Sequence, residues 1–142
     1  MVLGASRRQE LRYGENPHQS GVWYQWAATG GLPAGLGGAR QLHGKELSFN
    51  NLLDLDAALR LVFAFRKPAA VVVKHNNPCG AACAGALVEA FRRAFGGDPL
   101  SAFGGIVGLN RPVDAVTARA IAASGFLECV VAPGFRSEAL KV

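Results

Sequence analysis

Apolar residues recur along the chain with two different spacings, and each spacing predicts a different element. From Asn50 to about Phe65 they return every three or four residues, which predicts a helix with one apolar face. Ser48 or Asn50 is placed to cap its N-terminus. Residues 69–73, 106–109 and 127–132 are short apolar runs, typical of strands covered on both faces. This alternation predicts an α/β fold with a largely parallel sheet.

Turn-forming residues predict where the remaining helices begin and end. We expect a turn at residues 76–80, followed by a second helix that runs to about Phe95. A helix of small residues is expected from Asp114 to Ser124, where a glycine closes it. Ser137 is expected to open a further helix, close to the last residue of the sequence.

The N-terminal third of the chain has a weaker pattern. Residues 1–19 are polar and irregular, whereas residues 21–26 (GVWYQW) are rich in β-formers and predict a strand. Residues 29–38 predict a loop because glycine and proline dominate them. Residues 40–47 are expected to hold a further short strand.

Composition and charge narrow the class of protein. The 142 residues suit one globular domain, because half are hydrophobic and 18% are charged. The net charge of +5 is scattered along the chain, which weighs against a nucleic-acid partner. The mild excess of arginine suits an anionic metabolite that carries phosphate or carboxylate groups.

Cysteine usage and hydropathy bear on the compartment. Cys79, Cys83 and Cys129 lack the spacing of a disulfide framework. No apolar run approaches the ~20 residues that cross a bilayer. The first ten residues lack the apolar segment of a signal peptide. We therefore expect no membrane partner and a reduced, cytoplasmic setting.

Lys74 and His75 directly follow the apolar run that ends at Val73. Ligands of open α/β sheets bind at the carboxyl ends of strands. A histidine can accept a proton near neutral pH, and a lysine can polarise an oxygen or deliver a proton. A solvated strand end is the alternative for such a dipeptide. The following Asn76-Asn77-Pro78-Cys79-Gly80 favours an active site, because an expected helix N-terminus there would attract an anion.

Two further segments combine binding-type side chains with turn formers. Residues 12–19 (RYGENPHQ) contain an arginine that can grip phosphate or carboxylate. Residues 98–105 (DPLSAFGG) offer paired glycines for close backbone approach, and Phe103 for stacking on a heterocycle. The alternatives are an exposed polar loop for the first segment and a tight loop with a core phenylalanine for the second.

A zinc site could be considered at His75, Cys79 and Cys83, but the spacing of these residues disfavours it. The zinc deaminase pattern requires H-x-E and P-C-x-x-C, whereas this chain has P-C-x-x-x-C and no H-x-E. A closed zinc site also needs four ligands. We therefore expect no metal, and we expect Cys83 to pack as a small hydrophobic residue.

Four segments together carry a resemblance to a known family. LRYGENPHQ, ELSFNNLLDLDAAL, AVVVKHNNPCG and DPLSAFGGIVGLNRPVD, in this order and spacing, resemble the formyltransferase domain of the bifunctional AICAR transformylase/IMP cyclohydrolases. The match covers about residues 11–140. The resemblance implies transfer of a formyl group from 10-formyltetrahydrofolate to the 5-amino group of AICAR, in purine biosynthesis. It also implies a cytidine-deaminase-like, three-layer α/β/α sandwich with a mostly parallel sheet and without the deaminase metal.

The same resemblance implies roles for particular residues. Lys74 and His75 would be the catalytic pair. The implied substrate-binding residues are Arg12, Tyr13, Asn50, Ser101, Phe103 and Gly104, with His18 near them and Asn76 contributing its amide. The family further implies a homodimer with active sites at the subunit interface.

The resemblance also implies how the chain is organised. Residues 1–142 would be the first of two deaminase-like subdomains, with a cyclohydrolase domain expected before them and the second subdomain expected after them. We therefore expect little transformylase activity from this chain alone. The alternatives are a module that binds AICAR or phosphate without catalysis, and a separate subunit that pairs with a chain carrying the second half.

Overall fold

The computed structural model describes residues 4–26 and 35–142, and these residues belong to two compact units. The first unit comprises Met1–Leu53 and the second Asp54–Val142. Of the glycine- and proline-rich loop expected at residues 29–38, residues 29–34 lie outside the described part of the chain.

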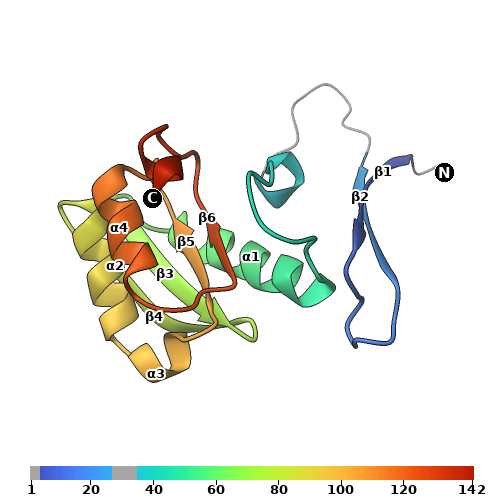
Figure 1. Ribbon diagram of the computed structural model, residues 1–142, viewed down its shortest axis with the longest axis horizontal. Coiled ribbons are helices and arrows are strands. Elements are labelled where there is room, and N and C mark those ends of the chain that lie inside the picture. The colour runs from blue at the N-terminus through green and yellow to red at the C-terminus, as the bar shows by residue number, and fades with distance from the viewer. Residues whose placement is uncertain (1–3, 27–34) are drawn as a thin grey trace. The chain divides into compact units, whose positions relative to one another are not determined.

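The first unit is built on a two-stranded antiparallel ribbon (Figure 1). Strand β2 (Gly21–Trp26) confirms the predicted strand, and β1 (Ala5–Leu11) pairs with it. The sequence did not predict strand β1, because most of its side chains are exposed and polar and show no apolar alternation. A 3₁₀ turn, η1, follows at Gly35–Gly38. The strand expected at residues 40–47 is wrong, since that segment is irregular.

The second unit contains a four-stranded sheet in the order β4-β3-β5-β6. Its strands are β3 (Ala69–Lys74), β4 (Asn77–Cys83), β5 (Ile106–Leu109) and β6 (Cys129–Val131). Strand β3 is antiparallel to both β4 and β5, and only β5 and β6 are parallel. The expectation of a mostly parallel sheet is therefore wrong. For β3 and β4 the physical reason is local: a two-residue turn sends the chain straight back, and such a connection can join antiparallel strands only. Strand β5 follows α2 and α3 and also runs antiparallel to β3.

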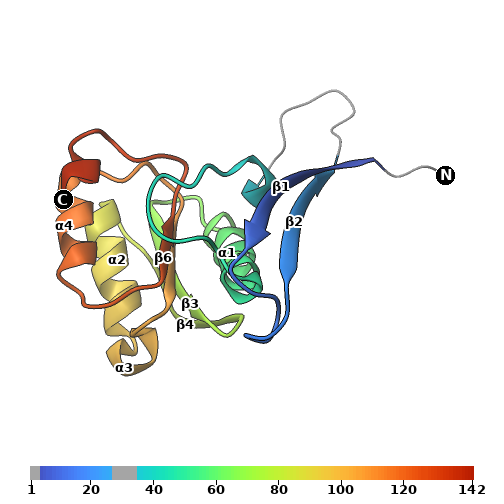
Figure 2. The same cartoon turned by 45° about the vertical axis from the view of Figure 1, so that its right-hand side comes forward.

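Helices cover both faces of this sheet (Figures 1 and 2). Helices α2 (Leu87–Gly96) and α4 (Ala115–Ala122) lie on one face. The part of α1 (Phe49–Val62) that belongs to this unit lies on the other. It approaches closely, since a Cβ built on Gly108 of β5 would lie 3.1 Å from the Cβ of Ala58. Two short turns complete the unit, α3 (Pro99–Ala102) and the 3₁₀ turn η2 (Ala139–Lys141).

The core explains why the apolar runs became strands. Every residue of β3 except Lys74 is buried, and so are all four of β5. One apolar cluster fills the space between the sheet and the helices α2 and α4, and Phe91 is its largest member. The side chain of buried Asn110 closes the end of β5 against β3, where its Oδ1 accepts a hydrogen bond of 2.8 Å from the N–H of Ala69. Strands buried on two faces therefore form here without a parallel sheet.

The second predicted helix begins later than expected. Residues 77–83 form strand β4, and α2 starts only at Leu87. Gly80 explains how the two pack, because a Cβ at this position would overlap the carbonyl oxygen of Ala94 in α2. Cys83 is exposed on this edge strand, so the expectation that it packs as a small hydrophobic residue is also wrong.

The other helices are close to their predicted positions. Helix α1 confirms the first, and Ser48 rather than Asn50 caps it. The Ser48 hydroxyl accepts from the N–H of Asn51, whose side chain in turn accepts from the N–H of Ser48. Helix α4 confirms the prediction at residues 114–124, with Asp114 as its cap. The helix expected from Ser137 is a single 3₁₀ turn.

Candidate active site

The turn between β3 and β4 holds His75 and Asn76 in an unusual backbone conformation. Lys74 and Asn77 form the last pair of the ladder, so these two residues alone make the turn. Their φ angles are +52° and +62°, the left-handed region that a type I′ hairpin turn requires. Asn and His enter this region more readily than most residues. The conformation still costs on the order of 1–3 kcal/mol for a residue other than Gly. Among the described residues they are the two non-glycine positions with positive φ.

Asp54 on helix α1 holds this turn through its two carboxylate oxygens. Oδ1 accepts a hydrogen bond of 2.7 Å from the N–H of Asn76, and Oδ2 accepts one of 3.2 Å from the N–H of His75. The side-chain amide of Asn77 donates a further hydrogen bond of 2.9 Å to the carbonyl oxygen of His75. The sequence pattern did not identify Asp54 as a site residue. Asp54 lies beyond the first turn of α1, and a contact across 21 residues leaves no local signal.

The Lys74 side chain reaches from the same turn to the loop before β5. Its Nζ donates a hydrogen bond of 2.9 Å to the carbonyl oxygen of Phe103. The Phe103 ring lies 5.9 Å from that of Phe126, and both rings are more than half exposed. Gly104 has φ +72° and donates to the carbonyl oxygen of Phe126 at 2.8 Å. Phe103 is therefore an exposed ring beside the lysine and not a core residue.

Cys79 connects strand β4 to the same loop. Its Sγ lies 3.6 Å from the carbonyl oxygen of Ser101, which is a weak contact. Burial raises the pKa of the Cys79 thiol, with Asp98 adding to the rise and Lys74 opposing it. A raised pKa leaves less thiolate at neutral pH, so the local electrostatics do not prepare Cys79 as a nucleophile. The expected helix N-terminus at this point is replaced by strand β4, which removes the anion-binding argument made for residues 76–80.

The candidates of the first unit lie on the β1–β2 loop and at the start of α1. The Arg12 guanidinium lies over the Tyr13 ring, 5.1 Å from its centroid. Tyr13 also accepts a backbone hydrogen bond of 3.1 Å from Phe49, the first residue of α1. The side-chain amide of Asn50 donates a hydrogen bond of 3.2 Å to the carbonyl oxygen of Glu15. These contacts bring the loop and the start of the helix together within this unit.

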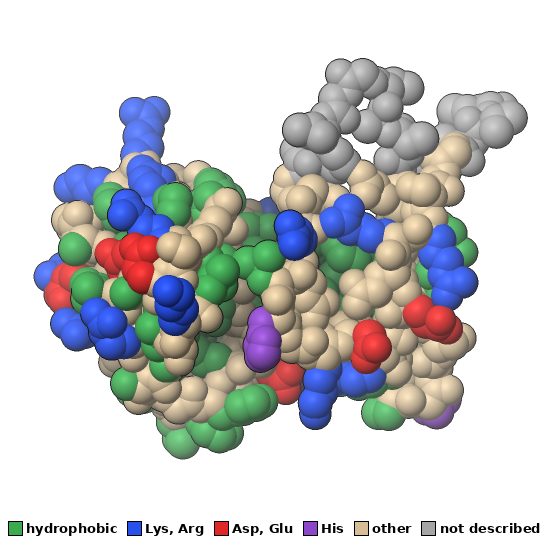
Figure 3. All heavy atoms as spheres, turned by 45° about the horizontal axis from the view of Figure 1, so that its top comes forward, with side chains coloured by type: hydrophobic (Ala, Val, Ile, Leu, Met, Phe, Trp, Pro, Cys, Tyr) green, Lys and Arg blue, Asp and Glu red, His purple; other side chains and the backbone are tan. Residues whose placement is uncertain are grey.

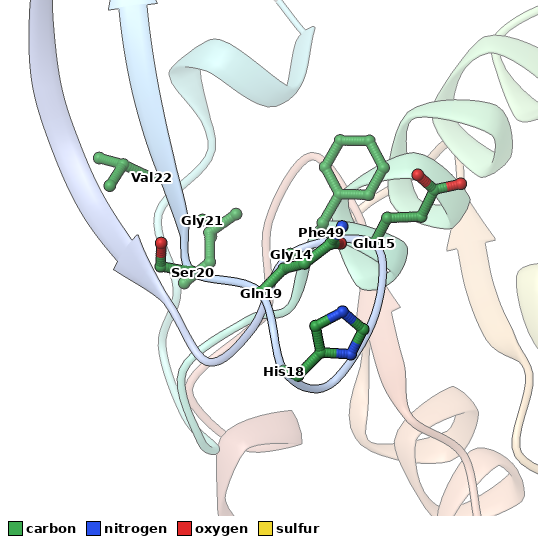
Figure 4. Close-up of a pocket in the computed structure, with 9 residues that line it drawn as sticks. Gly14, Glu15, His18, Gln19, Ser20, Gly21, Val22 and Phe49 are labelled. Atoms are coloured by element: carbon green, nitrogen blue, oxygen red, sulfur yellow. The ribbon is translucent and has the colours of Figure 1, made fainter.

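An open pocket of about 610 Å³ lies beside this loop (Figure 4). His18 and Glu15 line it from the loop, and Phe49 lines it from α1. Arg12, Tyr13 and Asn50 are not among its lining residues. The complete lining is Leu11, Gly14, Glu15, His18, Gln19, Ser20, Gly21, Val22 and Phe49.

The predicted site residues thus form two groups, one in each unit. The first unit holds Arg12, Tyr13, His18 and Asn50, and the second holds Lys74, His75, Asn76, Ser101, Phe103 and Gly104. Within the second unit, the β3–β4 turn and the 98–105 loop are joined by the contacts of Lys74 and Cys79. We call these six residues together with Asp54 the turn site.

Three features of the structure bear on a metal site, on the distribution of charge and on a membrane span. Residues 4–26 and 35–142 contain no group of three or more His, Cys, Asp or Glu side chains arranged to hold a metal ion. On the face drawn in Figure 3, Lys and Arg side chains are spread among acidic, polar and hydrophobic ones. Within the same described ranges, none of the helices is both long and apolar enough to cross a membrane.

Comparison with known proteins places the chain in a family. The family model described as "AICARFT/IMPCHase bienzyme" matches residues 1–142, the whole length of the chain. The chain belongs to this family. The four segments that carried the resemblance all lie within the matched residues, and the turn site takes residues from three of them.

Curated relatives share this assignment. Proteins called "Bifunctional purine biosynthesis protein PurH" match this chain with 55% identity over 142 residues in Trichormus variabilis and 56% over 142 residues in Synechocystis sp.. The Cyanothece sp. protein of the same name is 57% identical over 140 residues. These alignments cover 98–99% of this chain but 26–27% of each relative. The chain therefore spans about a quarter of the length of the bienzyme proteins it matches.

Proposed function

We propose that this chain supplies the Lys-His pair for formyl transfer from 10-formyltetrahydrofolate to the 5-amino group of AICAR. The observation that carries the proposal is the turn site, where Lys74 and His75 are adjacent at the end of a buried strand. His75 lies in a two-residue turn that Asp54 holds by two hydrogen bonds. Membership of the bienzyme family supports a role in purine biosynthesis, and the motifs favour the transformylase step.

The proposed roles follow from the chemistry of the reaction. The AICAR amine is a weak nucleophile, because its lone pair is delocalised into the ring. Attack on the formyl carbon requires loss of a proton, which His75 would accept directly or through a substrate group that it orients. Lys74 would stabilise the developing oxyanion or protonate the departing folate nitrogen. Its ammonium already donates to a carbonyl oxygen, so its position relative to the turn is defined.

The same proposal assigns substrate contacts. Arg12 carries a guanidinium that can bind a phosphate, and its position over Tyr13 restricts its freedom. The exposed Phe103 ring and the Gly104 backbone would receive the heterocycle. A cytidine-deaminase-like fold, a second subdomain, a homodimer and a cytoplasmic setting belong to this proposal as well.

A chimeric enzyme would test the catalytic roles. The matching segment of the Synechocystis relative is replaced by residues 1–142, which are 56% identical to it. Release of tetrahydrofolate from 10-formyltetrahydrofolate is then measured with AICAR as acceptor. We expect turnover by the chimera, and a decrease of about 10²–10⁴-fold in His75→Ala, because a positioned acid or base contributes that much. His43→Ala is the matched control, since this exposed histidine lies in the irregular segment before α1.

Each outcome has a clear meaning. Turnover in His75→Ala equal to that of the unsubstituted chimera would reject the role of His75. A chimera that is inactive, beside an active parent protein, would reject the function for this chain. Titration of the 142-residue chain with AICAR tests the alternative of a binding module. That alternative is favoured if the chain binds AICAR while the chimera transfers no formyl group.

A further inference from the structure

The β3–β4 turn is defined by two independent features of the backbone. The strands on either side fix where the turn lies, because Lys74 and Asn77 remain paired across the ladder. A two-residue connection between twisted strands favours type I′ and II′ turns, because types I and II would splay the strands. Type II′ requires positive φ at the first central residue only, whereas both His75 and Asn76 have positive φ here. Selection of the I′ form over the II′ form therefore calls for a contact beyond the ladder.

Asp54 meets this requirement. Each of its carboxylate oxygens accepts one amide, and the two amides belong to the two residues with positive φ. Hydrogen bonds to an ionised acceptor are stronger than neutral ones, and two bonds from one planar group fix orientation as well as distance. The carboxylate is itself carried by a helix that packs on the sheet, so it is held in place from outside the hairpin.

We propose that Asp54 is a positioning residue for catalysis, which holds the left-handed turn and thereby sets the direction of the His75 imidazole. This inference rests on the proposed function of His75. Asp54 bonds to backbone amides of the turn, and its effect on the reaction is transmitted through them. Because the ladder and the Asn77 side chain also support the hairpin, loss of Asp54 loosens the turn without unfolding the sheet.

The test uses Asp54→Ala in the full-length chimera, with Asp56→Ala as its matched control. Asp56 lies on the same helix, and its carboxylate pairs with Arg60 at 2.7 Å, so its removal deletes the same charge without touching the turn. Amide hydrogen exchange at His75 and Asn76 reports on the turn directly. We expect exchange at these two amides to accelerate at least about 10-fold in Asp54→Ala, because their acceptors are gone. Asp56→Ala should leave both rates unchanged.

Steady-state kinetics report on catalysis. In Asp54→Ala we expect kcat to fall by about 10²-fold, the cost of displacing a catalytic group by about 1 Å. The KM for AICAR should change by no more than a few-fold, because Asp54 has no role in the proposed phosphate contact of Arg12. A merely structural role would lower the amount of folded enzyme and its melting temperature, and would not produce a selective loss of kcat.

A second background separates positioning from loss of charge. Asn76→Gly removes the cost of positive φ at one of the two positions, since glycine adopts this region freely. In that background we expect the loss of kcat caused by Asp54→Ala to shrink severalfold. An equal loss in both backgrounds would mean that the carboxylate does not act by holding the turn, and would overturn the inference.

The remaining outcomes are equally decisive. Unchanged amide exchange in Asp54→Ala overturns the inference whatever happens to activity. Accelerated exchange with an unchanged kcat overturns the positioning role and leaves the proposed function standing. If the unsubstituted chimera transfers no formyl group, the proposed function fails and the catalytic role of Asp54 fails with it. The exchange rates then still decide whether Asp54 holds the turn.

Discussion

The two antiparallel hairpins of this chain carry candidate site residues in contrasting ways. The β1–β2 hairpin is exposed along most of its length, and a loop of nine residues, 12–20, joins its strands. The β3–β4 hairpin includes a strand that is buried almost throughout, and its turn has two residues. The first loop is held by an internal bond of 2.8 Å from the N–H of Gly14 to the carbonyl oxygen of Gln19, and by bonds from Phe49 and Asn50 at the start of α1. The second turn is held from outside by Asp54.

This difference suits the proposed roles of the two hairpins, phosphate binding for the first and proton transfer for the second. A long loop with internal bonds can adjust around a phosphate, and small displacements there cost little. Proton transfer needs a group held near its reaction partner within a fraction of an ångström. The hairpin with the short turn and buried strand supplies that constraint, and its two left-handed residues show that the constraint is maintained against a backbone cost.

The largest expected effect is at a glycine of the buried hairpin. Gly80→Ala places a methyl group on the carbonyl oxygen of Ala94, a backbone atom that cannot move without displacing α2. We expect a loss of about 3 kcal/mol or more in the free energy of unfolding. Urea unfolding followed by circular dichroism measures it.

The matched substitution lies in the exposed hairpin. A Cβ on Gly21 would lie 3.3 Å from the Cδ1 of Leu11 and from the Cα of Gly14, contacts that a small shift relieves. Gly21→Ala should therefore change the unfolding free energy by no more than about 1 kcal/mol. Equal losses in the two variants would mean that the two hairpins are equally constrained.

An intermediate effect is expected at the cap of α4. The backbone N–H of Thr117 donates to the Asp114 carboxylate at 2.8 Å, and this bond lowers the pKa of Asp114. A carboxyl group whose pKa is lower in the folded state stabilises the fold above its unfolded pKa of about 4, and loses that contribution as the pH falls. Asp114→Ala should cost about 1 kcal/mol at pH 7.

The pH dependence of the unfolding free energy tests whether the charge of Asp114 is responsible for this loss. The difference in unfolding free energy between the native chain and Asp114→Ala should narrow as the pH falls through the lowered pKa of Asp114. Asp98, whose pKa is also lowered by hydrogen bonding to Ser101, is present in both proteins and cancels from the comparison. A difference that stays constant from pH 7 to about pH 2 would show that the carboxylate charge is not involved.

The smallest effect compares a histidine in each hairpin. His75→Gly relieves the positive φ, so we expect a gain of about 0.5–1 kcal/mol in stability together with loss of the proposed activity. The φ of His18 is not positive, so His18→Gly should lower stability by about 0.5 kcal/mol through added freedom of the unfolded chain. The midpoints of urea unfolding of the two variants measure these changes in stability. A loss of stability in His75→Gly equal to the loss in His18→Gly would show that the turn carries no strain.

The sequence alone predicted the elements whose signal is local. The helical spacing of apolar residues located α1, and the short runs located β3 and β5. It also placed Lys74 and His75 at the end of a strand. It could not decide strand direction, because a buried strand is equally apolar in a parallel or an antiparallel pair. It missed β1, whose polar residues form a strand through pairing with β2 alone.

The amino-acid order of this chain thus predicted which residues carry the proposed chemistry, through motifs of polar residues beside apolar runs. The tertiary structure alone decided how that chemistry is held. Asp54 lies 21 residues before His75, yet its carboxylate bonds to the amide of the turn. Gly80 is required because α2 passes over it. Both facts depend on contacts between segments distant along the chain, and local patterns of side chains do not encode which distant backbone atoms will meet.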